Sequence, residues 1–380
     1  MKGKGRAVVI GSGIGGAGVA ALLAKKGLEV TVLERNSYPG GKGASFEKEG
    51  FVYDTGVHAI GSGEKGPLGD INRLVGGDLV FNLIEGGNRI ALGDRVAHYP
   101  LDFASDESIS AILEGIGVQP QNFDDCYACF RELATLKSAS EMEALDETPL
   151  KDYVDRFTDD PSFHMMMNAT CGMLIVVTYF TGSAGEFIHC FANMAKNASL
   201  SYPVGGVGSV AKAYLAALEK MGGRTEYGIP VEGIVVEGGR ATGVEAGGSR
   251  FEADVVVSNM GLQPTVRMIS DELPPDYVAR ANAMRSSYGA VSVKYALDAE
   301  IVLYPLTLWI PDITDPVALE KYVGIMYPVP SIADPSLVPA GCQLVLAGAV
   351  LSADPRQKDL NEDILNRIEA TMEMLHPGLG

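Results

Sequence analysis

A glycine-rich turn between an apolar segment and a helix-forming segment constrains the fold of this chain more than any other feature. Residues 7–10 are a short apolar run, typical of a strand buried on both faces of a parallel sheet. Gly11-Ser-Gly-Ile-Gly-Gly16 follows, and an alanine- and leucine-rich segment then ends at Gly27. A second apolar run occupies residues 28–33. This order predicts a right-handed βαβ unit.

The glycines of the turn have the spacing G-x-G-x-x-G. In such a turn a pyrophosphate can approach the backbone, and the free N–H groups and positive dipole end of the helix favour its charge. Glu34 ends the second run, 23 residues after Gly11, where a carboxylate accepts hydrogen bonds from ribose hydroxyls. Residues 61–66 repeat the spacing, but Pro67 comes next and we expect no apolar helix there. The first copy therefore predicts a dinucleotide site.

Length and charge limit the function classes. With 380 residues, of which 47% are hydrophobic and 21% charged, we expect a folded chain of about two domains. The 48 acidic and 30 basic residues give a net charge of −18. Such a chain repels phosphate backbones, so no nucleic-acid partner is expected. It also lacks the basic surplus that attaches proteins to anionic lipid.

The five cysteines are too few, and odd in number, for a disulfide framework, so we expect a reducing compartment. Cys126 and Cys129 have the C-x-x-C spacing of a redox pair or half a zinc site. No second such pair exists and no histidine lies near in sequence. We interpret them as small apolar residues on one face of a helix, and expect no metal.

Localisation is expected to be cytoplasmic, because a buried strand already begins near residue 6 and leaves no room for a signal peptide. The longest uncharged run, residues 165–185, contains many polar side chains and is a poor membrane span. Its apolar part, residues 173–180, is interpreted as a buried wall. Peripheral contact with a membrane is the alternative.

Periodicity outlines the rest of the chain. Residues 81–84 and 89–97 predict a hairpin around the glycines of residues 85–88. Residues 105–197 are mostly helical and resemble an inserted domain. Later elements are expected as a helix at 207–221, a strand at 224–227, a meander at 231–252, a buried strand at 253–258, strands at 288–297 and 343–350, and a helix at 357–375.

The segment after Glu34 distinguishes FAD from NAD. A nicotinamide domain would continue into another crossover helix. Here residues 35–42 bring a glycine doublet and a lysine, and residues 50–58 bring a strand and a tight glycine turn. This glycine-lined extended path suits a long flat cofactor.

Residues 11–16, 34–35, 39–42 and 51–56 resemble the N-terminus of the phytoene desaturase-like FAD-dependent oxidoreductases. That group is similar to retinol saturases and, more distantly, to the amine-oxidase flavoproteins. The resemblance resumes at residues 202–208, 228–234 and 253–259. It implies an α/β fold with a Rossmann-like, NAD(P)-binding-like FAD domain and an inserted mixed α+β, largely helical substrate domain. The expected FAD domain comprises residues 1–75 and 205–285, and the substrate domain residues 76–204 and 286–380.

The resemblance also implies a cofactor site. The pyrophosphate is expected at Gly11, Gly13 and Gly16, the ribose at Glu34 and the adenine at the backbone of Val231. Gly41 and Lys42 are expected along the flavin half. Gly56 and His58 are expected near the isoalloxazine, with His58 the catalytic candidate and an ordinary polar loop residue as the alternative. The expected set is Gly11, Ser12, Gly13, Ile14, Gly15, Gly16, Glu34, Arg35, Gly41, Lys42, Gly56, His58 and Val231.

The implied activity is hydride transfer between flavin N5 and a carbon–carbon bond of an apolar, isoprenoid or carotenoid-like substrate, by desaturation or saturation. Residues 165–180 and 301–310 are candidate tunnel walls, with plain core as the alternative. One rival is an amine-oxidase-like enzyme acting on a C–N bond, with Tyr202 and Trp309 framing the amine. No second dinucleotide fingerprint follows a suitable strand, so the electron acceptor is left open between oxygen, a quinone and a partner protein.

The end of the chain departs from the resembled family. That family closes with a glycine-rich strand, turn and helix that return to the FAD domain. Residues 376–380 end just past a helix without such a segment. We therefore interpret the sequence as a fragment that lacks the C-terminal FAD segment, and a non-catalytic FAD-binding fragment is a third functional alternative.

Overall fold

The computed structural model describes residues 5–56, 59–84, 86, 88–99, 102–197, 199–284, 289–311, 324–351 and 358–379. The chain forms two compact units. Unit 1 consists of Met1–Val57, Gly63–Phe81 and Pro203–Ser286, and unit 2 of His58–Ser62, Asn82–Tyr202 and Ser287–Gly380.

Unit 1 is organised around a four-stranded parallel sheet in the order β10-β2-β1-β14. β1 (Arg6–Ile10) and β2 (Glu29–Glu34) flank helix α1 (Ile14–Lys25) in sequence, which confirms the βαβ unit. The outer strands β10 (Arg224–Tyr227) and β14 (Val255–Ser258) come from much later in the chain. The first and last halves of the sequence therefore build one sheet.

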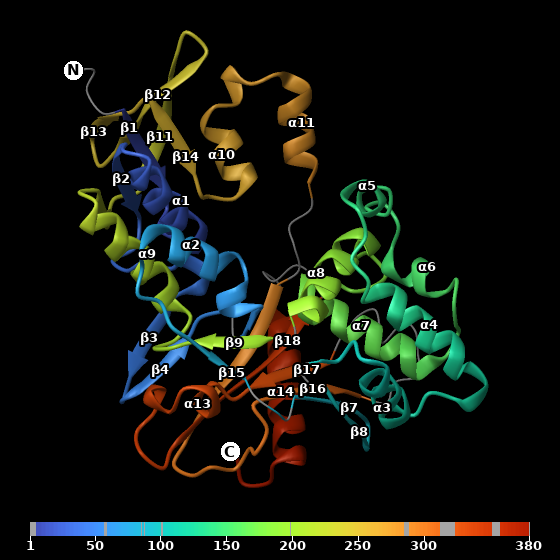
Figure 1. Ribbon diagram of the computed structural model, residues 1–380. Coiled ribbons are helices and arrows are strands. Elements are labelled where there is room, and N and C mark those ends of the chain that lie inside the picture. The colour runs from blue at the N-terminus through green and yellow to red at the C-terminus, as the bar shows by residue number, and fades with distance from the viewer. Residues whose placement is uncertain are drawn as a thin grey trace. The chain divides into compact units, whose positions relative to one another are not determined.

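Both faces of this sheet are covered (Figure 1). On one face, alanines of α1 pack against α9 (Gly208–Lys220) and α2 (Pro67–Val75) around the buried side chains of Val9 and Tyr214. On the other face, Val8 and Ile10 pack against an antiparallel meander. Its strands are β11 (Val231–Glu237), β12 (Arg240–Ala246) and β13 (Ser249–Glu252). The result is a three-layer arrangement of helices, parallel sheet and meander.

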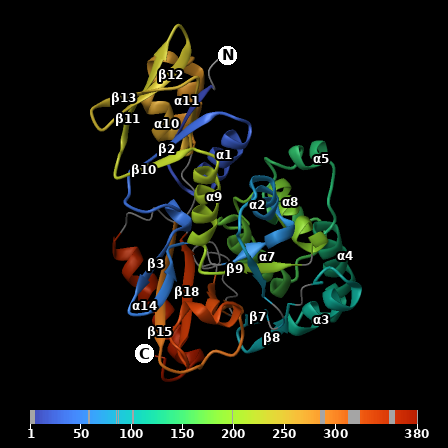
Figure 2. The same cartoon turned by 60° about the vertical axis from the view of Figure 1, so that its left-hand side comes forward.

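Smaller elements complete unit 1. A hairpin of β3 (Ser45–Lys48) and β4 (Phe51–Asp54) follows the short helix η1 (Gly41–Gly43). Beyond β14 come α10 (Leu262–Met268), η4 (Ser270–Glu272) and α11 (Pro275–Ala283). In Figure 2 the meander and the helices α10 and α11 stand together near β2.

Unit 2 contains a six-stranded sheet in the order β15-β18-β17-β16-β7-β8. All its neighbours are antiparallel except β16 and β7, which are parallel. The strands are β7 (Arg89–Leu92), β8 (Arg95–His98), β15 (Gly289–Leu297), β16 (Leu306–Ile310), β17 (Ile325–Pro328) and β18 (Gln343–Leu351).

Alternating side chains of this sheet serve two separate cores. Ile90, Leu92, Leu308 and Ile310 belong to the core formed with the helical block. The side chain of Trp309 points to the opposite face of the sheet. It belongs to the second core, which also contains residues of α14 (Lys358–Leu375). The helical block consists of α3 (Asp106–Ile116), η3 (Pro120–Asn122), α4 (Phe123–Leu133), α5 (Ala139–Glu143), α6 (Leu150–Val154), α7 (Pro161–Ile175) and α8 (Ala184–Asn197).

The remaining elements are short. A three-stranded sheet, almost entirely in unit 2, has the order β5-β9-β6. Its strands are β5 (Ile60–Gly61), β6 (Phe81–Leu83) and β9 (Leu200–Pro203). The last short helices are η2 (Gly63–Lys65), α13 (Pro330–Ala333) and η5 (Pro335–Leu337).

Two local expectations are wrong. The segments at 81–84 and 89–97 do not form one hairpin, since β6 belongs to the small sheet and the chain turns at Gly93 and Asp94 between β7 and β8. Gly93 has a φ of 60°, which a two-residue hairpin turn requires. A helix, α2, also follows the second glycine motif, because proline is tolerated at the first helical position. The strand before that motif is only two residues long and antiparallel.

Candidate functional site

The first glycine motif forms a turn that only glycine can make. Gly11 has a φ of 92°, and its N–H donates to the carbonyl of Leu33 over 2.8 Å. A Cβ atom on Gly16 would lie 2.1 Å from the carbonyl oxygen of Gly11. Since this contact is with backbone, no side-chain rotation relieves it. Helix α1 must therefore begin against the loop, with no side chain between them.

The N-terminus of α1 has no capping side chain. Gly13 is the N-cap residue, so it has no side chain to accept from the first N–H groups of the helix, and the first turn has no acidic residue. β1 lies between β2 and β14, so the strand order reverses beside it. The loop at its carboxyl end is therefore the topological switch point, where open parallel sheets bind ligands. This geometry favours a diphosphate.

Glu34 is buried, only 4% exposed, at the end of β2. Its Oε2 accepts from the Ser12 N–H and from the Ser12 hydroxyl, each over 2.8 Å. Its Oε1 accepts from the Asn36 N–H over 2.9 Å. A carboxylate has about four acceptor positions, so Oε1 retains capacity for a sugar hydroxyl. The glycine loop and the acid predicted for ribose are thus joined by side-chain hydrogen bonds.

The glycine doublet lies beside the first loop. The Gly40 N–H donates to the Ser12 carbonyl over 3.0 Å, and Gly13 and Gly40 form a parallel bridge. A Cβ on Gly41 would lie 3.5 Å from the Cα of Gly13. A Cβ on Gly56 would lie 2.8 Å from the carbonyl oxygen of Lys42. The structure thus brings together Gly13, Gly41, Lys42 and Gly56, and their role towards FAD stays a proposal.

A buried carboxylate holds this glycine segment against α9. Asp54 is 1% exposed, and it accepts from the Ser45 hydroxyl over 2.6 Å and from the Val207 N–H over 2.9 Å. The Ser45 oxygen in turn accepts from the Gly208 N–H over 2.8 Å, at the start of α9. Asp54 and Ser45 are positioning residues that the sequence reasoning did not identify.

The other expected residues lie around this centre. Val231 begins β11, two residues after Ile229, whose N–H donates to the Glu34 carbonyl over 2.9 Å. Arg35 is exposed and forms no ion pair in the described parts of the chain. His58 lies outside the described residues.

Asn259 is a third residue of this site, besides Asp54 and Ser45, to which the sequence assigned no role. It follows β14 directly, and its side chain lies against the positions of Gly13, Gly15 and Gly16. The signal was present, since a polar residue after a buried strand, beside the glycine loop, marks the switch point. Which later strand pairs with β1 cannot be read from local sequence, however.

The cysteine pair has no catalytic surroundings. Cys126 and Cys129 are fully buried in the helical block, and both are free. Burial raises the pKa of the Cys126 thiol to about 11, and that of Cys129 is raised for the same reason. Among the described residues no cluster of histidine, cysteine and carboxylate side chains could hold a metal ion. Within that same set, no helix combines the length and apolarity that a bilayer crossing needs.

The fold and the glycine loop define a class, the dinucleotide-binding oxidoreductases with a Rossmann-like domain. Residues 9–73 match the model of the NAD(P)-binding Rossmann-like domain. Residues 111–379 match the model of flavin containing amine oxidoreductase. The chain belongs to this family, which confirms the expected fold class and FAD as the cofactor. The residues present fit FAD, because they provide a loop restricted to glycine, an uncapped helix N-terminus and a buried carboxylate.

The curated relatives are named for reactions of carotenoids and retinoids. A chloroplastic prolycopene isomerase of Daucus carota is 26% identical over 427 residues, covering 98% of this chain and 67% of its own length. A zeta-carotene-forming phytoene desaturase of Myxococcus xanthus is 26% identical, covering 68% of this chain and 53% of its own. An all-trans-retinol 13,14-reductase of Homo sapiens is 52% identical over 62 residues, 16% of this chain and 10% of its own. This chain thus spans between half and two thirds of the length of the first two.

A solved structure of an oxidoreductase from Methanosarcina mazei has the same fold. It superimposes with a TM-score of 0.82 at 19% sequence identity, covering 98% of this chain and 85% of that one. At that identity the likeness concerns the fold alone.

Proposed function

We propose that this chain is an FAD-dependent oxidoreductase that acts on a carbon–carbon bond of an apolar isoprenoid substrate. The observation that carries the proposal is the agreement of its relatives. A prolycopene isomerase, a phytoene desaturase and a retinol reductase are named for different reactions on conjugated isoprenoids.

In this proposal unit 1 binds the cofactor. The loop at Gly11 and the N-terminus of α1 hold the pyrophosphate, and Glu34 orients the adenosine ribose. FAD, when bound, supplies a hydride acceptor or donor at N5. The chain orients the cofactor through the hydrogen bond between Ser12 and Glu34, which fixes the glycine loop. It does so also through the hydrogen bonds of Asp54, which fix the glycine segment against α9.

Unit 2 is proposed as the substrate domain. Most of the expected tunnel segments turn out to be packed core. Met165, Met166 and Met167 are buried in the helical core, and Trp309 is buried in the second core, which also contains residues of α14. These side chains therefore stabilise unit 2, and they do not by themselves support a tunnel. Tyr202 is also fully buried, so neither aromatic of the amine-oxidase alternative is displayed on an open surface.

The decisive experiment uses the 380-residue chain loaded with FAD, without oxygen, and polyprenoids in detergent micelles. Phytoene added to the oxidised protein should bleach the flavin bands if the chain desaturates. A retinoid or carotenoid added to the chemically reduced protein should restore the bands if the chain saturates. Either result supports the proposal.

Two other outcomes contradict it. Bleaching by putrescine but not by any polyprenoid would assign the amine-oxidase alternative. A flavin that responds to no substrate in either redox state, with every polyprenoid recovered chemically unchanged, would assign a non-catalytic FAD-binding role. Repeating the assay with lipid vesicles in place of micelles tests the alternative of peripheral membrane contact, which predicts faster bleaching from vesicles.

A further inference from the structure

The four glycines of the first motif share one neighbour outside the loop, the side chain of Asn259. A Cβ built on Gly13 would lie 2.9 Å from its Nδ2, and one on Gly15 would lie 2.9 Å from its Oδ1. One on Gly16 would lie 3.0 Å from Nδ2, and one on Gly11 would lie 3.9 Å from the Asn259 Cβ. The carboxamide therefore lies across the loop and the first turn of α1.

The backbone fixes Asn259 in this place. Its N–H donates to the Ile10 carbonyl over 2.9 Å, which continues the pairing of β14 with β1 by one residue. The hydroxyls of Ser258 and Thr265 lie 2.7 Å apart and tie the end of β14 to α10. The carboxamide is thus presented at the switch point by two parallel strands.

The carboxamide of Asn259 is accessible to a ligand. Asn259 is exposed, and its carboxamide makes no hydrogen bond in the described part of the chain. The contrast is Asn72, whose Nδ2 donates to the Leu79 carbonyl and whose Oδ1 accepts from the Leu79 N–H. Water therefore takes the hydrogen bonds of the Asn259 amide, and a ligand beside the glycine loop can replace that water without breaking a contact of the protein.

We propose that Asn259 is a positioning residue for the FAD pyrophosphate, donating an amide hydrogen to a phosphate oxygen, and that Gly13 and Gly15 are glycine in part to admit this side chain. The inference rests on the proposed cofactor site. A neutral donor suits the place, because the open N-terminus of α1 already attracts the anion. An aspartate would have the same shape but would repel it.

The test measures the dissociation constant of FAD by quenching of its fluorescence, for the parent chain, Asn259→Ala and Asn259→Asp. Asn282→Asp is the matched control, since it makes the same charge change at an exposed position of α11. Loss of a hydrogen bond to a charged group predicts FAD binding about tenfold to a hundredfold weaker for Asn259→Asp. Asn282→Asp should stay within about twofold.

Competition with ADP and adenosine locates the effect. Both Asn259 variants should weaken ADP binding, and adenosine binding should stay within about twofold, because only ADP has the pyrophosphate. Urea denaturation confirms that the variants are folded, and Asn259→Ser replaces any that is not. Equal FAD and ADP affinities in all variants would overturn the proposal, whereas a parent chain that binds no FAD would overturn the cofactor site itself.

A double-mutant cycle tests the role of the glycine. Gly15→Ala places a methyl group against Oδ1 of Asn259, so it should weaken FAD binding strongly in the parent and much less in the Asn259→Ala background. Strictly additive losses would show that Gly15 makes room for the cofactor alone, and would contradict that part of the proposal.

Discussion

Replacing Gly16 by alanine is the sharpest test of the turn that is proposed to hold the cofactor. The new Cβ would lie 2.1 Å from the carbonyl oxygen of Gly11, so loop and helix must separate by about 1 Å. Gly18 provides a control two residues further along α1. Its Cβ would lie 3.4 to 3.5 Å from Ile71 and Tyr214, which is ordinary contact.

The two substitutions have opposite expected signs. Alanine in a helix interior is better than glycine by up to about 1 kcal/mol, so Gly18→Ala should be neutral or slightly stabilising. Gly16→Ala gains the same helix propensity, but the overlap of its Cβ with the Gly11 carbonyl oxygen costs about 1–3 kcal/mol or more. We expect a net loss of unfolding free energy for Gly16→Ala only.

Urea denaturation of the FAD-free chain, followed by circular dichroism, measures this difference directly. FAD titration of the same proteins should show binding at least about tenfold weaker for Gly16→Ala and nearly unchanged for Gly18→Ala. Equal unfolding free energies and equal FAD affinities for the two variants would refute the reasoning, because the same chemical change would then be insensitive to the close contact.

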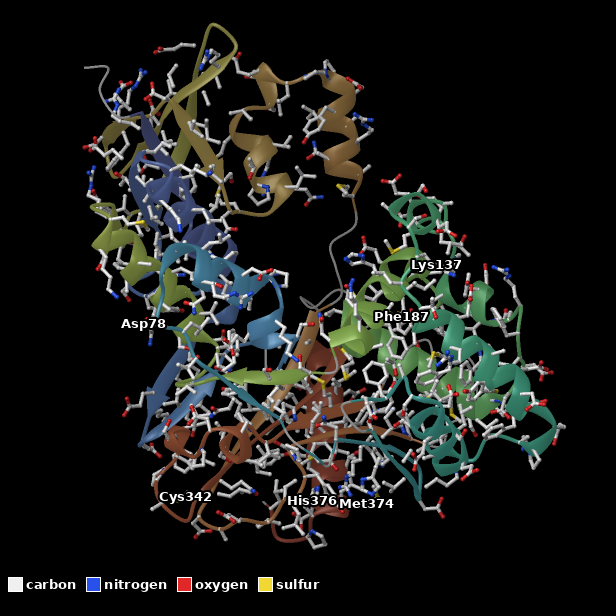
Figure 3. All side chains as sticks on the ribbon, in the orientation of Figure 1. Asp78, Lys137, Phe187, Cys342, Met374 and His376 are labelled. Carbon is white, nitrogen blue, oxygen red and sulfur yellow. The ribbon has the colours of Figure 1, made fainter. Side chains whose placement is uncertain are left out.

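Three further predictions concern unit 2. Phe187 (Figure 3) is fully buried and stacks on Phe191, so Phe187→Ala should cost about 3–5 kcal/mol of unfolding free energy. Substitution of the exposed Met374 by alanine should change the unfolding free energy by no more than about 0.5 kcal/mol, and equal effects of the two variants would contradict the assignment of the core. Burial and the nearby Arg89 lower the pKa of His376 below its usual 6.5, so the unfolded chain takes up the proton first and the free energy of unfolding falls as pH drops below about 6.5. His376→Gln should flatten this part of the plot of unfolding free energy against pH, and an unchanged plot would contradict the role of His376. Because Cys126 is buried and its pKa is raised, iodoacetamide at pH 8 should label it only after unfolding, and should label the less buried Cys342 first. Rapid labelling of Cys126 in the native chain would contradict this and would support a redox role.

Local sequence was sufficient for elements whose pattern and pairing are close together. The strand, turn and helix of residues 6–25 and the meander of residues 231–252 were predicted because their periodicity and glycines lie within a few residues. The helical block was predicted for the same reason. The tie between Ser12 and Glu34 follows from the fingerprint that predicted both residues.

Long-range pairing was not available from the sequence. The parallel pair of β7 and β16 joins residues more than two hundred positions apart, and the local sequence of neither strand indicates which strand it pairs with. The turn at Gly93 and Asp94 was missed because the glycines of residues 85–88 offered a competing signal. Asn259 was missed for a related reason, since its place beside the glycine loop depends on β14 pairing with β1.

The most direct test of the account is flavin binding by the purified 380-residue chain. After incubation with FAD and removal of the free cofactor, the account predicts flavin absorption bands corresponding to one FAD per chain. Replacement of Glu34 by alanine should weaken FAD binding by about tenfold or more, because the ribose and the loop lose their shared partner. A folded chain that stays colourless and leaves FAD fluorescence unquenched would contradict the central claim.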